Sequence, residues 1–300
     1  MNFKNYTTLA KYDIYKQLEE ELHLEIKSEL YDEKEKEFEL IPLRESIKEA
    51  QKRLDNPGGL DGISTGYKNL DSYLGGFAPE ELIVVAGGTG TGKTQYVQSI
   101  ILNMVLDNNP VLFFTLEMPP VETTVRFMRM IKSKLAGDVL PELPIYYYYG
   151  TNVNTSVLEK AIQKGITLGV KCVVIDHIHF FAKNNDNQAA EVGNIAREIK
   201  LLARKYKIPI ILIAHIRKTG SPTRIPTLED IKDSSGVAQD ADSVLMVWRD
   251  TESLSEEVQK ELKVKVRKNR RRGTLGGCQY KLDHNYFLQE MEYDSFKEDF

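Results

Sequence analysis

The chain has 300 residues, which allows one large domain with an appendage or two small domains. Hydrophobic residues make up 41% and charged residues 28% of the chain, as in ordinary soluble proteins with a packed core. The net charge of -4 argues against a basic nucleic-acid coat, although residues 263–272, KVKVRKNRRR, hold seven cations in ten positions. The sequence has neither a membrane-length apolar run nor a secretion signal, and its two cysteines lie far apart, so we expect a cytoplasmic protein without a disulfide scaffold.

The first 56 residues differ from the rest in composition. Residues 1–41 form a highly charged segment, in which a ragged apolar stripe predicts a helix over 8–40. Residues 42–56 predict a linker helix, with apolar positions at three-to-four spacing over 43–54, and the sequence DNPGG then ends it. We therefore place a domain boundary there and assign residues 57–300 to one larger domain.

From residue 60 onwards, short β-rich runs alternate with helical patterns. The predicted strands are 82–86, 111–116, 145–149, 172–175, 208–214, 244–248 and 262–267. The predicted helices are 93–106, 121–136, 155–168 and 188–206, and 276–282 with 285–290 predict a terminal hairpin. This alternation indicates an α/β fold with a mostly parallel, twisted sheet and helices on both faces.

A glycine-rich sequence, GGTGTGKT, follows the first of these strands and opens the first helix. It fits the phosphate-binding pattern G-x-x-x-x-G-K-T, whose backbone N–H groups and helix N-terminus surround phosphate oxygens, while the lysine reaches the β- and γ-phosphates and the threonine can ligate Mg²⁺. The alternative is a glycine-rich turn that matches the pattern by chance. The predicted ATP-binding residues are Gly87, Gly88, Thr89, Gly90, Thr91, Gly92, Lys93 and Thr94.

Three polar residues end other apolar strands, at the edge where the phosphate-binding loop is expected. Asp176 is predicted to support Mg²⁺ together with Thr94, and Glu117 to activate the attacking water. His215 is a candidate sensor of the γ-phosphate. The alternatives are a capping role for Asp176, a solvated loop position for Glu117 and a structural role for His215.

The basic run supplies cations that could complete this site. Lys268 and Arg270 alternate along one side of an expected strand end, and nothing in the sequence directs them to their own phosphate-binding loop. We therefore expect them to reach the nucleotide of a neighbouring subunit, where an added cation accelerates hydrolysis by about 10³–10⁵-fold. The alternative is a solvated basic turn or a simple phosphate-contacting patch. Arg249, after the strand that ends at Trp248, is a candidate to flank the adenine.

In this order, the motifs resemble those of the DnaB-type replicative helicases, a family that includes phage primase-helicases and mitochondrial Twinkle. The resemblance spans residues 43–290 and includes GGTGTGKT, TLEM (115–118), VVIDHIHFF (173–181), IPIILIAHIRK (208–218), QDAD (239–242) and KNRRRG (268–273). It implies a RecA-like core assembled as a ring, which we expect to be a homo-hexamer, and Lys268 and Arg270 take the family's finger role by position. The His215 strand is more similar to Twinkle than to bacterial DnaB, which usually has glutamine there.

The resemblance also implies a DNA-binding loop after the His215 strand. Lys232, Asp233 and Ser235 fall where the family binds the strand backbone, and the loop also carries Arg217 and Lys218. A second loop, 182–194, is expected to face the same channel. Contacts of this kind bind single-stranded DNA without reading its bases.

One departure from the family concerns the amino terminus. The residues before the linker helix are too few for a primase-binding domain or a primase, so loading and priming are expected from separate proteins. The sequence thus predicts an ATP- and Mg²⁺-dependent ring helicase that acts on forked DNA, moving 5′ to 3′. Two alternatives stay open: a RecA- or KaiC-like recombination or regulatory ATPase, and a loader or packaging accessory that uses nucleotide as a structural switch.

Overall fold

The computed structural model describes residues 41–56, 58–135, 142–182, 188–217, 224–231 and 235–291. Its contacts divide the chain into two units, Met1–Pro57 and Gly58–Phe300. In the first unit, helix α2 (Leu43–Asp55) confirms the helix predicted over 43–54, and its apolar side chains Leu43, Ile47 and Leu54 are exposed. The helix predicted over 8–40 lies outside the described residues.

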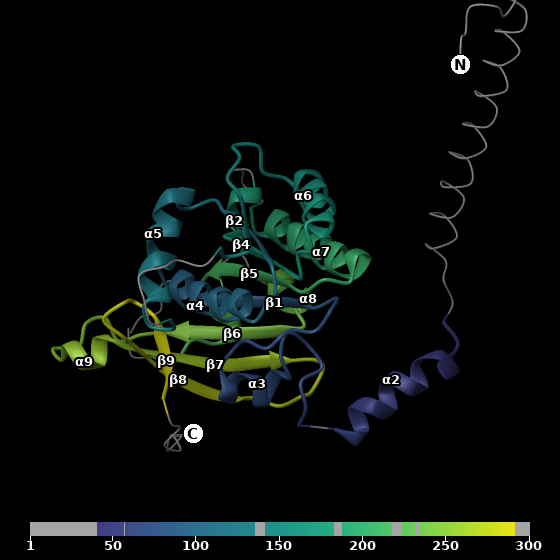
Figure 1. Ribbon diagram of the computed structural model, residues 1–300, viewed down its shortest axis with the longest axis horizontal. Helices are drawn as coiled ribbons and strands as arrows, with labels where there is room; N and C mark the ends of the chain where they lie inside the picture. The colour runs from purple at the N-terminus through teal and green to yellow at the C-terminus, as the bar shows by residue number, and fades with distance from the viewer. Residues whose placement is uncertain are drawn as a thin grey trace, which may run out of the picture. The chain divides into compact units, whose positions relative to one another are not determined.

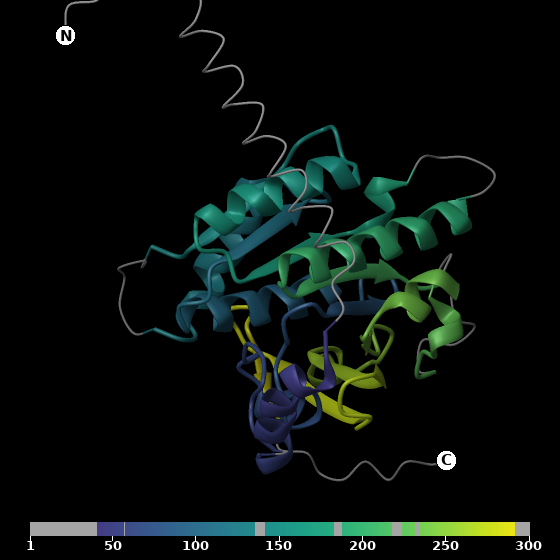
Figure 2. The ribbon, with the colours of Figure 1, turned by 90° about the vertical axis from the view of Figure 1, so that its right-hand side faces the viewer.

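A nine-stranded sheet forms the frame of the larger unit (Figure 1). The strand order is β3-β2-β4-β5-β1-β6-β7-β8-β9. The six strands from β3 to β6 are mutually parallel, and β7, β8 and β9 continue the sheet in antiparallel fashion at one edge, coloured yellow in Figure 2. The strand bounds are β1 (Leu82–Gly87), β2 (Val111–Thr115), β3 (Ile145–Tyr148), β4 (Cys172–Asp176), β5 (Ile210–His215), β6 (Ser243–Trp248), β7 (Glu261–Asn269), β8 (Gly276–Leu282) and β9 (Leu288–Glu290).

Helices cover both faces of this sheet because alternate strand residues point to opposite sides. On one face, Ile83 and Val85 of β1 share a buried cluster with α4, whereas Leu82 and Val84 share another cluster with α7 on the opposite face (Figure 1). The helix bounds are α3 (Lys68–Leu74), α4 (Lys93–Leu106), α5 (Pro120–Ile131), α6 (Thr155–Thr167), α7 (Gln188–Tyr206), α8 (Ser235–Asp240) and α9 (Glu256–Gln259), with 3₁₀ turns η2 (Ile178–Phe181) and η3 (Leu228–Asp230). In the part of the chain that is described, no helix combines the length and the apolar character needed to cross a membrane.

The observed elements confirm the predicted α/β arrangement, although some of the predicted bounds differ. The helix predicted over 121–136 ends at Ile131, and the second strand of the terminal hairpin begins at Leu288 instead of residue 285. The expected second DNA loop, 182–194, is wrong over 188–194, because these residues form the first turns of α7. Residues 183–187 lie outside the described part.

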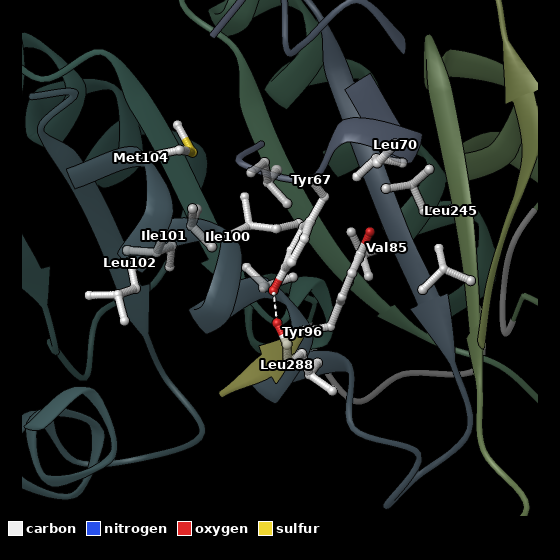
Figure 3. Close-up of a cluster of buried hydrophobic side chains, with 14 of the residues drawn as sticks. Tyr67, Leu70, Val85, Tyr96, Ile100, Ile101, Leu102, Met104, Leu245 and Leu288 are labelled. Atoms are coloured by element: carbon white, nitrogen blue, oxygen red, sulfur yellow. Dashed lines mark hydrogen bonds between the residues drawn. The ribbon is translucent and has the colours of Figure 1, made fainter. Parts of the chain in front are cut away.

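A cluster of buried side chains ties the terminal hairpin to the first half of the domain, and Figure 3 shows Tyr67 beside Leu288 of the hairpin. The Tyr67 hydroxyl donates a hydrogen bond to the Leu288 carbonyl at 2.7 Å, and its ring meets the Tyr280 ring edge-on at 4.7 Å. The Tyr96 and Tyr280 hydroxyls lie 3.3 Å apart. Burial raises the pKa of the Tyr67 phenol well above its usual range, so this hydroxyl remains a donor at physiological pH. The cluster therefore fixes the hairpin against α4, the helix that begins in the phosphate-binding loop.

The parallel pairing brings the candidate site residues to one edge of the sheet. Gly87 at the end of β1 is in register with His215 at the end of β5. On the other side, Thr115 of β2 pairs with Asp176 at the end of β4. Ligands of open α/β sheets bind at the carboxyl ends of parallel strands, and Asp176 and His215 end β4 and β5 at that edge.

Candidate nucleotide-binding site

The glycine-rich loop joins β1 to α4 as predicted, and its backbone conformation depends on glycine. Gly90 and Gly92 have φ angles of 76° and 96°, in the left-handed region that side chains disfavour. A Cβ on Gly87 would lie 2.4 Å from the Val247 carbonyl oxygen of β6, so this strand end also requires glycine. The Thr91 hydroxyl donates to the Gly88 carbonyl at 2.8 Å and closes the loop. The result is a cradle of backbone at a helix N-terminus, which suits phosphate oxygens.

Lys93 is the buried cation of this loop. Its side chain is only 5% exposed, and its ammonium donates to the Gly88 carbonyl at 2.7 Å. Burial lowers the pKa of Lys93 to about 8, an effect that the carboxylates of Asp176 and Glu117 partly offset. The ammonium therefore lies within the loop that would surround the phosphates and can exchange the carbonyl for phosphate oxygens.

Thr94 and Asp176 meet at the predicted metal position. The Thr94 hydroxyl donates to Oδ2 of Asp176 at 2.8 Å, and Oδ1 of Asp176 is buried without a hydrogen-bond partner among the described residues. Burial raises the pKa of Asp176 to about 6; the Thr94 hydrogen bond and the Lys93 charge act in the opposite direction. A hydroxyl and a free carboxylate oxygen are the hard ligands that Mg²⁺ prefers, so these two residues fit the ion.

Glu117 and His215 line the same cleft as the phosphate-binding loop. The cleft has a volume of about 510 Å³, and its walls also include Thr89, Gly90, Gly92, Lys93 and Thr94. Glu117 is exposed in the turn after β2, and that turn is held by the Thr115 hydroxyl, which donates to the Met118 carbonyl at 2.6 Å. His215 is half-buried. The structure thus brings together the strand-end carboxylate, the strand-end imidazole and the loop that the sequence singled out.

The cleft also contains residues that the sequence reasoning missed. Arg126 and Arg129, one turn apart on α5, face the cleft, as do Gln95 and Tyr286. The Arg129 guanidinium lies 5.7 Å from the centre of the Tyr286 ring, and this half-exposed ring offers a flat surface for a base. The available signal was the i, i+3 spacing of the two arginines in the helix that follows the TLEM motif. The tyrosine gave none, because only the fold of the hairpin carries it to the cleft.

Arg249 lines the cleft from the end of β6, on the side of Gly92. Its Nη2 atom lies 3.1 Å from the position that a Cβ on Gly92 would take. Its Nε and Nη2 atoms are buried without a hydrogen-bond partner among the described residues, and burial lowers the pKa of the guanidinium. This arrangement leaves donors available to a nucleotide in the cleft.

The two candidate finger cations lie at the opposite end of the sheet. On β6, Val247 pairs with Gly87 at the cleft, whereas Ser243 pairs with Asn269, which lies between the two cations. Ser243 lies four residues from Val247, a distance of about 13 Å at the usual rise of a strand. Lys268 donates to the carbonyls of Ala238 and Gln239 at 2.8 and 2.9 Å. Neither cation lines the cleft, so within one chain they stand apart from the site.

Arg270 contacts the same segment. It donates to the Gln239 carbonyl at 3.0 Å and lies 3.4 Å from Oδ1 of Asp242, while 55% of its side chain is exposed. The next two arginines are structural: Arg271 bonds Glu81 and the carbonyls of Leu74 and Gly76, and Arg272 bonds Asp61. Of the four cations in KNRRR, Lys268 and Arg270 are therefore the two that another molecule could most easily contact.

The structure describes the predicted DNA loop only in part. Lys218, Lys232 and Asp233 lie outside the described residues, and Ser235 begins α8. The backbone N–H of Arg217 donates to the Asp230 carbonyl at 2.7 Å, and Ile216 forms a β-bridge with Ile231. The two ends of the loop are therefore pinned together beyond β5, next to His215.

A family model described as DnaB-like helicase C terminal domain matches residues 62–140 and 132–290. The chain is 28% identical over 259 residues to a probable replicative DNA helicase of Trieres chinensis, covering 76% of this chain and 56% of that protein. It is 25% identical over 240 residues to the replicative DNA helicase DnaB of Buchnera aphidicola, covering 69% and 51%. The chain spans about half the length of these relatives.

Solved structures share the fold. A DnaB-like replicative helicase, described with its interactions with primase, matches with a TM-score of 0.71 at 20% identity, over 94% of this chain and 76% of that one. A solved ATPase domain matches with a TM-score of 0.73 at 20% identity, over 85% and 100%. The RadB recombinase matches with a TM-score of 0.56 at 19% identity, over 77% and 100%. These likenesses confirm the RecA-like fold expected from the sequence.

Proposed function

We propose, because this chain belongs to the DnaB-like helicase C-terminal domain family, that it is the motor of a replicative DNA helicase. It hydrolyses ATP, assembles as a homo-hexameric ring, moves 5′ to 3′ on single-stranded DNA and unwinds the duplex at a fork. One observation supports this most directly: Thr94 meets Asp176 in a cleft shared by Lys93, Glu117 and His215, while the finger cations lie at the far end of the sheet.

Each cleft residue has a role that follows from its position. The loop from Gly87 to Thr94 holds the phosphates by backbone N–H groups, and Lys93 adds a buried charge against the β- and γ-phosphates. Thr94 and Asp176 hold Mg²⁺, which neutralises phosphate charge when bound. Glu117 orients the attacking water and accepts its proton, and His215 responds to the γ-phosphate. Arg249 and Tyr286 contact the sugar and base end of the nucleotide.

Lys268 and Arg270 add positive charge to a neighbouring subunit's cleft, across a subunit boundary. They project from the sheet end opposite the cleft, which suits a head-to-tail ring in which one subunit's far end meets the next subunit's cleft. In the single chain they bond the carbonyls at the end of α8, directly after the DNA loop. Exchange of these carbonyls for a neighbour's phosphate would couple nucleotide state to the position of the DNA loop.

A subunit-mixing experiment tests this arrangement. Lys93→Ala removes phosphate binding but keeps the finger, and the double variant Lys268→Ala/Arg270→Ala keeps the cleft but lacks the finger. Each variant alone should lose at least about 10³-fold in DNA-stimulated ATP hydrolysis. Mixed rings should recover part of the activity, because some clefts then face an intact finger. Arg204→Ala, at an exposed cation of α7, is the matched control.

Two results would refute the role of Lys268 and Arg270 in a neighbour's cleft. One is that mixed rings recover no activity, and the other is that the double variant hydrolyses ATP at the wild-type rate. Native mass measurement with ATP and a single-stranded oligonucleotide should show the six-fold species.

The DNA contacts proposed are those of the loop after β5. Arg217, Lys218, Lys232, Asp233 and Ser235 bind the strand backbone through one or more cations and main-chain N–H groups, which needs no base readout. The Lys232→Ala variant should keep basal ATP hydrolysis but lose the stimulation of that hydrolysis by DNA. Full stimulation by DNA in this variant would show that the loop does not bind the strand.

A separate primase or loader is a candidate partner, and we place the activity in the cytoplasm.

Two assays separate this function from its alternatives. Unwinding of a forked duplex identifies a helicase, whereas strand exchange by a filament identifies a recombinase such as the structural neighbour RadB. Steady-state phosphate release excludes a protein that binds nucleotide as a switch only. Glu117 in the cleft favours turnover over a switch.

A further inference from the structure

Three side chains near the cleft could together hold a metal ion other than Mg²⁺. The ligand atoms of Glu117, His177 and His215 all lie within 4.8 Å of one another. They come from three separate strand ends, because Glu117 follows β2, His177 follows β4 and His215 ends β5. The His177 and His215 rings meet edge-on with their centres 4.4 Å apart. Parallel pairing of these strands holds the three groups on one side of the sheet edge.

The chemistry of this group favours a transition metal. Two imidazoles and a carboxylate are ligands that zinc takes in open sites, whereas Mg²⁺ prefers oxygen ligands and water. Ligand atoms around tetrahedral zinc lie about 3.4 Å apart, as metal–ligand distances of about 2.0–2.1 Å require. The observed spread of up to 4.8 Å exceeds this spacing by about 1.4 Å, a movement that exposed Glu117 and half-buried His177 and His215 can share.

We propose that Glu117, His177 and His215 bind Zn²⁺, at a position distinct from the Mg²⁺ position at Thr94 and Asp176, and that zinc there stops ATP hydrolysis. The inhibitory effect rests on the proposed function, because zinc would occupy the carboxylate that orients the water and the imidazole that responds to the γ-phosphate. Both of these residues line the cleft, so the fourth zinc ligand would be water or a phosphate oxygen from that side. His177 is the ligand with no other role assigned to it.

The binding test uses Co²⁺, whose visible absorption reports tetrahedral coordination, on the full chain without nucleotide. We expect one Co²⁺ per chain, displaced by Zn²⁺. His177→Asn and Glu117→Gln should each weaken binding at least about 10-fold, since even the loss of an outer-shell partner has an effect of that size. Asp176→Asn should keep the absorption band, and His284→Asn, at an exposed imidazole of the hairpin, is the matched control. Thermal melting of each variant checks that it folds.

The inhibition test measures ATP hydrolysis at fixed Mg²⁺ with increasing Zn²⁺, each protein relative to its own zinc-free rate. Zinc should inhibit the wild type reversibly on addition of a chelator, and the zinc concentration for half inhibition should rise at least about 10-fold in His177→Asn. Equal Co²⁺ binding by wild type and both ligand variants would overturn the site. Zinc that binds without inhibiting would overturn the inhibitory role. Were the chain to lack ATP hydrolysis altogether, the proposed function would fail, while the Co²⁺ titration would still decide the site.

Discussion

Asp176→Asn should make the protein more stable while it removes Mg²⁺-dependent nucleotide binding. Asp176 is 3% exposed, and burial raises the pKa of its carboxyl from 3.8 to about 6. At neutral pH the fold must therefore keep a buried carboxylate whose Oδ1 has no hydrogen-bond partner in the described structure. Asparagine has the same shape, carries no charge and can still accept the Thr94 hydroxyl.

The size of the effect follows from the pKa shift. A rise of about 2 pKa units corresponds to about 3 kcal/mol less stability for the charged form, at 1.36 kcal/mol per unit. Because the folded pKa is the higher one, the wild type loses this stability as the pH rises from 3.8 through about 6. The variant should therefore be about 3 kcal/mol more stable than the wild type at pH 7.5, and only about 1 kcal/mol more stable at pH 4.5.

Urea unfolding of the nucleotide-free protein at the two pH values measures this difference. A second measurement, the change in melting temperature on adding ATP with and without Mg²⁺, should show a Mg²⁺ effect in the wild type alone. An Asp176→Asn protein no more stable than wild type at pH 7.5, or a stability gain equal at both pH values, would refute the reasoning. Such a result would mean that the carboxylate is solvated or paired in solution.

Further predictions concern the loop and its support. Lys93 must be protonated to bind phosphate, so kcat/KM should fall about 10-fold for each pH unit above about 8, measured as a pH profile with excess Mg²⁺. Gly87→Ala should abolish ATP binding in an equilibrium assay with a labelled nucleotide, because its Cβ would meet the Val247 carbonyl at 2.4 Å. Asp242→Ala should lower the unfolding free energy by about 3–5 kcal/mol in urea titrations, since it leaves the Lys200 ammonium, now 2.6 Å away, without its buried partner.

Local patterns predicted the parts of the fold that depend on neighbours in sequence. The helix 93–106 was predicted with its observed bounds, since the glycine-rich loop fixes its start and a polar turn follows Leu106. The strand ends at Asp176 and His215 were marked by a polar residue after an apolar run, and parallel pairing then brought them to one edge. In these cases one short motif determines both the element and the chemistry at its end.

Contacts between distant segments could not be predicted in this way. Tyr286 reaches the cleft because the Tyr67–Leu288 bond and the buried rings hold the hairpin on α4, across more than half of the chain. The helix α3 over 68–74 is only seven residues long, too short for a periodic apolar pattern to stand out. His177 gave no signal of its own, because its neighbours in the structure come from two other strands.

The contacts of the finger cations place a thermodynamic condition on the proposed ring. Lys268 and Arg270 donate three hydrogen bonds to the carbonyls of Ala238 and Gln239 at the end of α8. Hydrogen bonds from charged donors contribute about 1.5–3 kcal/mol each, so a neighbour's phosphate must offer more than these carbonyls do before the cations move. If the exchange occurs, nucleotide in one subunit and α8 in the next compete for the same two side chains. Suppose that DNA binding to one subunit displaces its α8 and thereby increases the affinity of the neighbouring subunit for nucleotide. Linkage then requires that nucleotide bound to the neighbour increases the affinity for DNA by the same factor.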